Sequence, residues 1–369
     1  MKTNPKVLFV IGGFGLGNST RCDAVIQELA IRGFHIDVAT SNNGLWYFSS
    51  SPAVKRLFPL RALSYGRRNG QISLIGTLLA VPVSLFSLLL NACRLWRLQR
   101  GSVYQWIAVD SEYSCFLIKW ILSARLVAIN NVFFTFQCRN TKGPRLTIGL
   151  LLHRAFESFD FAVQSFFSDY RIAPALCWEQ ARQDSGTLFC PNFVRFLAPG
   201  AHSKVKRLNH ALVVASGSGL GVSRDTIEQL VRSERIAKIS VVGLEGTSTG
   251  KVHYFGRCRT VQSMYDNADF VVGNAGFSTI SEAIANNRLM LVYPLHNHYE
   301  QYFNAEFVEA AGLGVVVRSD GLTEGLIGLE GILEKKLAER PKVEKSSING
   351  TVAAADFLSA ISNAAAVSA

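Results

Sequence analysis

The sequence has little charge, and most of the charge it has is positive. Only 18% of the 369 residues are charged whereas 49% are apolar, so the chain can bury large cores and is not disordered. The 38 basic residues exceed the 27 acidic ones, which gives a formal net charge of +11. This excess favours an anionic partner such as a phospholipid surface or a phosphorylated substrate. DNA-reading motifs and aromatic-studded basic strands are absent, so we do not expect nucleic-acid binding.

Paired cysteines and a secretion signal are also absent. The seven cysteines are scattered and contain no C-x-x-C pair, which is typical of reduced core residues in a cytoplasmic protein. The first apolar run, Val7–Ile11, is too short for the core of a signal peptide. His296 and His298 offer two metal ligands, but nothing nearby completes a set. We therefore predict a cytoplasmic protein with no metal and no cofactor.

One long stretch lacks charge altogether. No charged residue lies between Gln71 and Ala92, and Ile72–Leu90 is long enough to cross a bilayer, although Pro82 interrupts it. Three arginines follow at three-residue spacing: Arg94, Arg97 and Arg100. Three interpretations stay open, namely a helix or helix pair packed on a core, an interfacial patch on an anionic membrane, and a true span.

The length of the chain, and the alternation of strand and helix patterns along it, predict two α/β domains. At roughly 150 residues per domain the chain is long enough for two, and strand-length apolar runs alternate with helical patterns, as in parallel α/β layers. The series restarts after a linker-like stretch at 195–208, so we place the domains at 1–200 and 201–369, with the last helix free to pack back on the first domain. We expect strands near 6–11, 35–40, 106–110, 126–130, 160–164, 211–215, 238–242, 270–273, 290–293 and 314–317.

A glycine-rich turn follows the first predicted strand. It contains Gly15 and Gly17 and leads through Asn18 into an amphipathic helical pattern. Such a turn lets backbone approach a ligand closely and points N–H groups at negative charge. The turn lacks the Lys-Ser/Thr of a nucleotide-triphosphate loop and is not a clean dinucleotide fingerprint.

A second turn carries a stronger signal. A buried strand ends at Gly273, a tight loop follows, and a helix begins near Ser278 with Glu282 in its first turns. The N–H groups at the start of that helix and the helix dipole suit a diphosphate, and Glu282 can accept both hydroxyls of a ribose. In the alternative interpretation, Ser278 and Thr279 simply cap an ordinary helix.

These residues resemble a known family. Residues 256–314 look like the C-terminal donor domain shared by the peptidoglycan GlcNAc transferase, the plant galactolipid synthases and the UDP-glucuronosyltransferase superfamily. The glycine-rich N-terminal turn is similar to the acceptor-side loop of those enzymes, and the glycines at 217–221 are similar to their phosphate-side loop. The matching features in this sequence are Ala268-Asp269, the Ala-Gly-x-Ser-Thr turn at 275–279, Glu282, Pro294 and Glu300-Gln301-x-x-Asn304-Ala305.

The resemblance implies a GT-B fold, in which two Rossmann-like doubly wound domains face each other across a cleft. It also implies transfer of a sugar from a UDP-type nucleotide sugar without a metal. Glu282 would bind the ribose, Gly276, Ser278 and Thr279 the diphosphate, and Gln301 with Glu300 the sugar. The residues implied on the donor side are Gly217, Ser218, Gly219, Asn274, Gly276, Ser278, Thr279, Glu282, Glu300 and Gln301.

One departure from the family concerns the general base. Many relatives have a His where this chain has Asn18, and an amide cannot accept a proton at neutral pH. Asp110 and Glu112, at the end of an apolar strand, are the next candidates, although carboxylates at such positions are often structural. A mechanism that needs no base is the remaining alternative.

Two rival functions remain open from the sequence. A non-hydrolysing UDP-sugar epimerase would have the same architecture, but no Arg-Pro-Glu-like segment follows residues 290–294. A non-catalytic sugar-nucleotide-binding subunit would explain Asn18. The uncharged stretch at 71–92 favours an acceptor that is lipid-linked or delivered at the inner face of a membrane.

Overall fold

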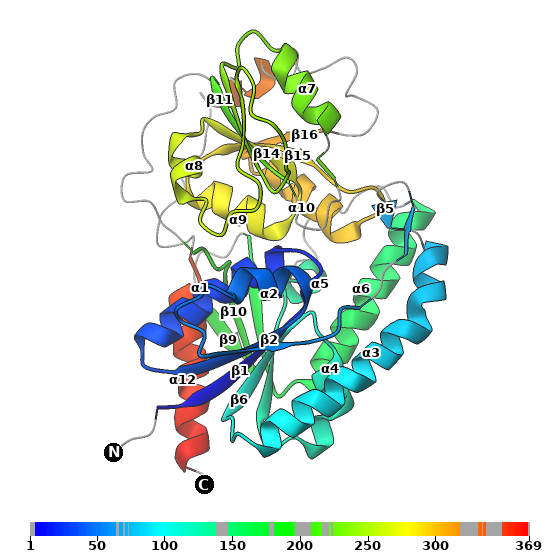
Figure 1. The fold of residues 1–369 in the computed structure, drawn as a ribbon, viewed down its shortest axis with the longest axis vertical. Coiled ribbons are helices and arrows are strands. Elements are labelled where there is room, and N and C mark those ends of the chain that lie inside the picture. The colour runs from blue at the N-terminus through cyan, green and yellow to red at the C-terminus, as the bar shows by residue number, and fades with distance from the viewer. Residues whose placement is uncertain are drawn as a thin grey trace. The chain divides into compact units, whose positions relative to one another are not determined.

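The computed structural model describes residues 4–63, 66–68, 71–72, 74–137, 147–176, 181–195, 208–215, 221–222, 224–317, 331–333, 335–336 and 349–367. The chain divides into two compact units. The first contains residues 1–137, 157–195 and 349–369, and the second contains residues 138–156 and 196–348. Each unit is an α/β domain built on its own sheet (Figure 1), which confirms the predicted fold class.

The first unit is built on an eight-stranded sheet whose order is β3-β2-β1-β6-β7-β8-β10-β9. All neighbours pair in parallel except β9 and β10, which form an antiparallel edge. The central strands are buried on both faces, as expected when helices cover a parallel sheet. The strands are β1 (Lys6–Ile11), β2 (His35–Thr40), β3 (Arg56–Pro59), β6 (Trp106–Asp110), β7 (Arg125–Ile129), β8 (Tyr170–Ala175), β9 (Arg182–Asp184) and β10 (Thr187–Pro191), beside a small pair β4 (Arg67–Arg68) and β5 (Gln71–Ile72).

The helices of this unit include the last one of the chain. Helix α12 (Thr351–Val367) packs against α1 (Gly17–Ile31), where Arg32 donates to Asp356 at 2.6 Å. The indole N–H of Trp106 donates to Ser362 Oγ at 2.8 Å and fixes α12 to the sheet. The other helices are α2 (Asn42–Phe48), α3 (Leu74–Arg100), α4 (Ser114–Leu117), η1 (Lys119–Ile121), α5 (Val132–Gln137) and α6 (Ile148–Phe167), whose first residues belong to the second unit.

The chain enters α12 beside the point where it leaves the first unit. Val194 N donates to Asn349 Oδ1, and Asn349 Nδ2 donates to Val194 O, both at 3.3 Å. A Cβ on Gly350 would lie 2.0 Å from the carbonyl oxygen of Pro191, so only glycine fits there. The division between the units after Arg195 falls within the stretch where the sequence predicted a linker, and residues 196–207 lie outside the described part of the chain.

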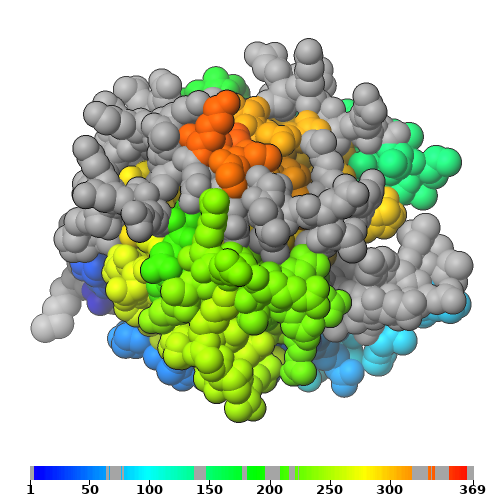
Figure 2. Space-filling view, turned by 90° about the horizontal axis from the view of Figure 1, so that it is seen from above, coloured from blue at the N-terminus to red at the C-terminus, as the bar shows by residue number. Residues whose placement is uncertain are grey.

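The second unit is built on a six-stranded parallel sheet in the order β13-β12-β11-β14-β15-β16. Helix α7 (Arg224–Arg232) contributes to the surface of this unit that Figure 2 shows in green. The strands are β11 (His210–Val214), β12 (Lys238–Val242), β13 (Val252–Tyr254), β14 (Phe270–Asn274), β15 (Leu289–Tyr293) and β16 (Gly314–Val316), with helices α8 (Gln262–Asn267), α9 (Phe277–Ala285) and α10 (Tyr299–Ala310).

Nine of the ten predicted strands are confirmed to within one residue at each end. The strand predicted at 160–164 is wrong, because these residues lie inside the 20-residue helix α6. The apolar residues Phe159, Val163 and Phe167 repeat every four residues, which is the helical period, and the short apolar run at 161–163 concealed that repeat. The sequence reading also missed the short strands β3, β9 and β13 and the longer strands β8 and β10.

Within the described residues, one helical stretch has the length and composition of a membrane span. It runs from Leu79 to Arg100 in α3, with a mean hydropathy of 1.6, and 22% of it is buried in the protein. Such a helix is weak evidence of a span by itself.

Candidate functional site

The predicted donor-side residues gather at the carboxyl edge of the second sheet. β14 ends at Asn274, and α9 begins at Phe277 with Gly276 in an extended conformation before it. The first N–H groups of a helix point out of its end, and here no capping side chain and no acidic residue in the first turn neutralises them. Ser278 and Thr279 lie within this first turn, half-buried, and not at the cap position. The helix end thus has the polarity that favours an anion.

Neutral side chains join the two strand-end loops. Asn304 is fully buried in α10 and donates through Nδ2 to the carbonyl oxygen of Ala275 at 3.1 Å. Gln301, in the first turn of α10, accepts through Oε1 from Leu295 N at 3.0 Å. The loops after β14 and β15 are therefore tied to the start of one helix, and Gln301 keeps its Nε2 group for another partner.

Asn274 also has a structural contact. Its Oδ1 accepts from Val222 N at 2.9 Å, which brings the segment after β11 to the end of β14. Gly221 lies in the left-handed region with φ of +94°, and a Cβ there would lie 1.9 Å from Asn274 Oδ1, so glycine is needed for this approach. The other residues predicted in this loop, Gly217, Ser218 and Gly219, lie outside the described residues.

Two carboxylates lie on the helices at this edge. Glu282 is half-buried on α9, one turn after Ser278, as the sequence predicted. Glu300 accepts through Oε1 from Asn304 Nδ2 at 3.3 Å. A helix end that favours anions thus stands next to a carboxylate one turn further on, which is an arrangement that can bind a phosphate and a diol together.

In the first unit, the glycine-rich turn after β1 is held by close backbone approaches. A Cβ on Gly13 would lie 1.8 Å from the carbonyl oxygen of Ser41, and one on Gly12 would lie 2.5 Å from that of Ser111. These two glycines let the turn meet the loops after β2 and β6. Gly15 has open space at its Cβ position, and Gly17 begins α1. Of the glycines in this turn, Gly15 is thus less constrained by packing than Gly12 and Gly13.

Asp110 is engaged in a buried ion pair with Arg21. Arg21 Nε donates to Asp110 Oδ2 at 3.0 Å and Arg21 Nη2 to Asp110 Oδ1 at 2.7 Å, and the two side chains are 4% and 1% exposed. The same guanidinium donates to Asn131 Oδ1 at 3.0 Å and to Asn18 Oδ1 at 3.2 Å. Arg21 thus holds both oxygens of Asp110 and fixes which way the Asn18 amide points.

The sequence reading overlooked Arg21, although the pattern of α1 contains a signal for it. Arg21, Val25 and Leu29 are spaced by four residues, so they share one face of the helix, and all three are buried. A basic residue on the apolar face of a helix requires a buried partner, because an unpaired charge is costly to remove from water. Asp110 at the end of β6 is that partner.

Glu112 has a different environment from Asp110. It is 4% exposed, and its Oε1 accepts from Ser114 N at 3.0 Å and from the Ser114 hydroxyl. Burial raises the pKa of Glu112 above its usual value, and the two hydrogen bonds from Ser114 oppose that shift. Asp160, on α6, likewise has a raised pKa because of burial, with further contributions from the nearby Glu157 and Asp110 charges. Carboxyls with raised pKa values therefore lie near the ion-paired Asp110.

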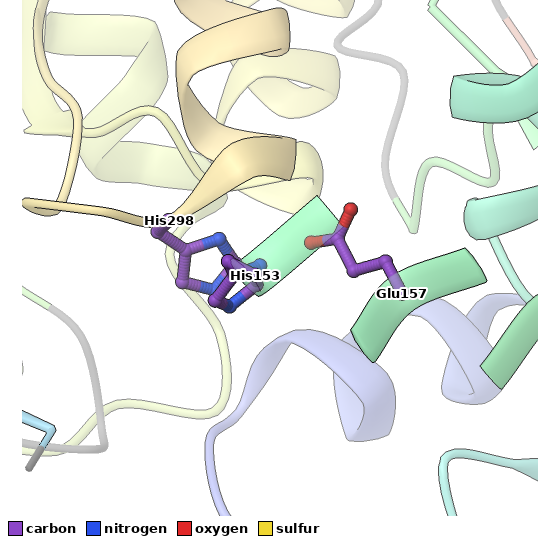
Figure 3. Close-up of side chains that lie close together, drawn as sticks. All are labelled: His153, Glu157 and His298. Carbon is purple, nitrogen blue, oxygen red and sulfur yellow. The ribbon is translucent and has the colours of Figure 1, made fainter. Parts of the chain in front are cut away.

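Apart from His296, the sequence shows no partner near His298 along the chain, but the structure places the ring of His153 beside His298. The rings of His298 and His153 lie 4.5 Å apart between centroids within the second unit, and Glu157 is one turn further along α6 than His153 (Figure 3). Burial, with a smaller effect from His153, lowers the pKa of His298 to about 3, so the ring is neutral at physiological pH. His298 thus has an imidazole neighbour that sequence spacing did not reveal.

The comparison with protein families found a match that includes the carboxyl edge of the second sheet. Residues 226–360 match the model of the glycosyltransferase family 28 C-terminal domain. The match includes β14, α9, β15 and α10, and therefore every described residue predicted to bind the donor. The likeness of this segment to a glycosyltransferase donor domain, which the sequence indicated, is confirmed.

Similarity to individual proteins supports the same fold. The chain is 34% identical over 91 residues to the UDP-N-acetylglucosamine–N-acetylmuramyl-(pentapeptide) pyrophosphoryl-undecaprenol N-acetylglucosamine transferase of Wolinella succinogenes. That match covers 24% of this chain and about a quarter (26%) of the relative.

Solved structures match over nearly the whole length. MurG of Acinetobacter baumannii has a TM-score of 0.59 at 12% identity, covering 96% of this chain and 100% of that one. A UDP-glucosyltransferase from Polygonum tinctorium has a TM-score of 0.60 at 13% identity, covering 99% and 94%. The chain has the GT-B glycosyltransferase fold.

Proposed function

We propose that this protein is a glycosyltransferase that moves a sugar from a UDP-type nucleotide sugar to an acceptor. The observation that carries the proposal is the edge of the second sheet, where the start of α9 favours an anion and Glu282 follows one turn later. This arrangement lies inside the segment that matches the family 28 donor domain. The fold shared with MurG and with the Polygonum tinctorium UDP-glucosyltransferase supports it.

Each part of the donor then has a partner of suitable chemistry. The diphosphate binds at the start of α9 with Gly276, Ser278 and Thr279, because backbone N–H groups and the helix dipole stabilise negative charge there. The same dipole stabilises the charge that develops on the leaving diphosphate, which lowers the barrier to transfer without a metal. Glu282 accepts hydrogen bonds from the ribose diol. Gln301 donates through Nε2 to the sugar, and Glu300 contributes a carboxylate beside it.

On the acceptor side, we assign the general base to Glu112 in preference to Asp110. Both oxygens of Asp110 accept from Arg21, so its carboxylate serves to hold that guanidinium and, through it, Asn18. The raised pKa of Glu112 makes its carboxylate a stronger base than an exposed one, which suits proton removal from an acceptor hydroxyl. Asn18 orients the acceptor by hydrogen bonding.

The site of action is the cytoplasmic face of an anionic membrane. The net charge of +11 and the uncharged stretch of α3 that precedes three arginines support this location. A lipid-linked or membrane-delivered acceptor would be concentrated at such a surface.

Nucleotide-sugar screening tests the proposal. UDP and UDP-sugars should raise the melting temperature of the protein, because a ligand at 100 times its Kd adds about 2.7 kcal/mol of stability. Slow release of UDP from the stabilising UDP-sugar would then distinguish a transferase from a binding subunit, and interconversion of UDP-sugars without UDP release would indicate an epimerase. The absence of stabilisation by any uridine nucleotide would refute the donor assignment.

A further inference from the structure

The positive charge of the protein is concentrated in one part of the sequence. Residues 38–156 contain fourteen basic and two acidic residues, a net charge of +12, so the rest of the chain has a net charge of −1. The two acidic residues are Asp110 and Glu112, which are both buried. Asp37 pairs with Arg56 and Asp169 pairs with Lys119, so acidic residues outside the stretch offset part of this excess. The positive charge that remains favours an anionic partner.

Helix α3 lies within this stretch and is attached to the first unit by one side. The buried residues of its second half, Ser87, Asn91, Leu95 and Gln99, are spaced by four and share one face. Asn91 is bound to the backbone of Arg61, donating to its carbonyl oxygen at 2.9 Å and accepting from its N–H at 2.8 Å. This half of the helix is fixed on the protein and cannot lie in hydrocarbon.

The opposite face of α3 changes from apolar to basic along the helix. Leu79, Phe86 and Leu89 are 76%, 58% and 57% exposed, and all three lie opposite the buried face. About two to three turns after Leu89, the exposed Arg97 and Arg100 take the place of the apolar side chains on that face. Exposed apolar side chains in such a group mark a surface for an apolar partner, and the arginines beside them indicate that this partner is also anionic.

The exposed apolar side chains named above cover less than the thickness of a bilayer. From Leu79 to Leu89 the helix rises about 15 Å at 1.5 Å per residue, which is about half of the ~30 Å hydrocarbon core of a bilayer. An amphipathic helix with apolar side chains on one face and arginines nearby instead lies at the boundary of headgroups and acyl chains.

We propose that the outer face of α3 docks obliquely on an anionic lipid bilayer. Leu79, Phe86 and Leu89 enter the acyl region, while Arg97 and Arg100 stay at the level of the lipid phosphates. The inference deepens the membrane location proposed above by naming the surface and its orientation. It rests on that proposed function only for its biological purpose, because lipid binding can be measured without donor or acceptor.

Vesicle sedimentation with purified full-length protein tests the proposal. We expect binding to vesicles of 30% phosphatidylglycerol in phosphatidylcholine, and weaker binding as salt rises from 50 to 500 mM, because salt screens the arginines but not the apolar contacts. Replacing the three apolar residues together (Leu79→Gln, Phe86→Gln, Leu89→Gln) should weaken binding about a hundredfold or more at both salt concentrations. Replacing both arginines (Arg97→Glu, Arg100→Glu) should weaken it about tenfold or more at low salt and remove the preference for phosphatidylglycerol.

Matched controls separate docking from general effects of composition. Ile31→Gln replaces a residue that is 82% exposed on α1, and Arg232→Glu with Lys238→Glu reverses two exposed charges in the second unit. These controls should bind vesicles as the unaltered protein does. UDP affinity, measured by calorimetry without lipid, should be unchanged in every variant, so a failure of the donor assignment would be seen separately.

Three outcomes would overturn the inference. The first is that the unaltered protein does not sediment with anionic vesicles at 50 mM salt. The second is that the triple glutamine variant sediments as well as the unaltered protein. The third is that light scattering detects an oligomer that the triple variant converts to a monomer with no change in vesicle binding, because the face would then be covered by a second copy of the chain.

Discussion

Within each unit, the loops at the carboxyl edge of the sheet are joined by hydrogen bonds or ion pairs, and the two units differ in which kind they use. In the second unit the loops are joined by neutral amides, with Asn304 bound to Ala275 and Gln301 bound to Leu295. In the first unit the corresponding loops meet around a buried ion pair between Arg21 and Asp110. Neutral hydrogen bonds contribute little net stability each, whereas a buried ion pair creates a large penalty when one partner is removed.

This difference has a consequence for function. At the second edge, the carboxylate of Glu282 is half-buried and so is partly open to solvent. At the first edge, the charges of Arg21 and Asp110 already satisfy each other. Substitutions at the second edge should therefore affect ligand affinity, and substitutions of the buried pair should affect stability first.

Removal of Arg21 should have the largest effect. Arg21→Met keeps most of the side-chain volume but leaves Asp110 buried without its cation, which should lower the free energy of unfolding by about 3–5 kcal/mol. Urea denaturation followed by circular dichroism measures this loss. The double variant Arg21→Met with Asp110→Leu should recover much of it, because no charge remains buried. A loss below about 1 kcal/mol for Arg21→Met would show that the pair does not organise this edge.

Removal of Glu282 should affect binding instead. Hydrogen bonds to a charged acceptor contribute about 1.5–3 kcal/mol, so Glu282→Ala should weaken UDP and UDP-sugar alike by about ten- to a hundredfold. Calorimetric titration measures both affinities. Glu228→Ala, at an exposed position on α7 in the same unit, is the matched control and should leave both unchanged. Equal affinities for Glu282→Ala and the unaltered protein would remove Glu282 from the donor site.

Gln301 allows the contact with the loop to be separated from the contact with the sugar. Gln301→Ala removes the acceptor of Leu295 N as well as the Nε2 donor, whereas Gln301→Glu keeps the acceptor and replaces the donor by a second, negatively charged carboxylate oxygen. We expect Gln301→Glu to weaken UDP-sugar about three- to tenfold, as for one neutral hydrogen bond, and to leave UDP affinity nearly unchanged. If both ligands lose affinity equally in Gln301→Glu, the residue does not contact the sugar.

The sequence predicted the strand, turn and helix at the carboxyl edge of the second sheet because the information there is local. Asn274, Gly276, Ser278 and Glu282 lie within nine residues that cross from β14 into α9, so strand, turn and helix positions follow from one short pattern. Asn304 was visible as part of the family motif, but its contact with Ala275 joins two separate loops. Spacing along the chain cannot reveal such a contact.

The first edge was predicted less well because its key contacts are distant in sequence. Arg21 and Asp110 are 89 residues apart, and their contact depends on β1 and β6 being neighbours in the sheet. The base candidates were therefore chosen from their position after β6 alone. The same limitation explains α6, because the local apolar run at 161–163 favours a strand unless the four-residue repeat of the whole 20-residue helix is considered.

Replacement of Glu112 by glutamine should produce the smallest change in stability and a distinctive dependence on pH. Because burial raises the folded-state pKa of Glu112, its ionisation opposes folding, so the unaltered protein loses stability as pH rises through that pKa. The glutamine side chain of the Glu112→Gln variant does not ionise, and its amide oxygen can still accept from Ser114. The unfolding free energy of Glu112→Gln relative to the unaltered protein should therefore be higher at pH 8 than at pH 4.5, while Asp225→Asn, at an exposed position on α7, should show no such rise. Urea denaturation at the two pH values measures the difference.

If Glu112 is also the general base, Glu112→Gln should lower turnover by about a hundredfold or more and leave donor affinity intact. Full turnover in a variant that still shows the pH effect on stability would mean that Glu112 has a purely structural role.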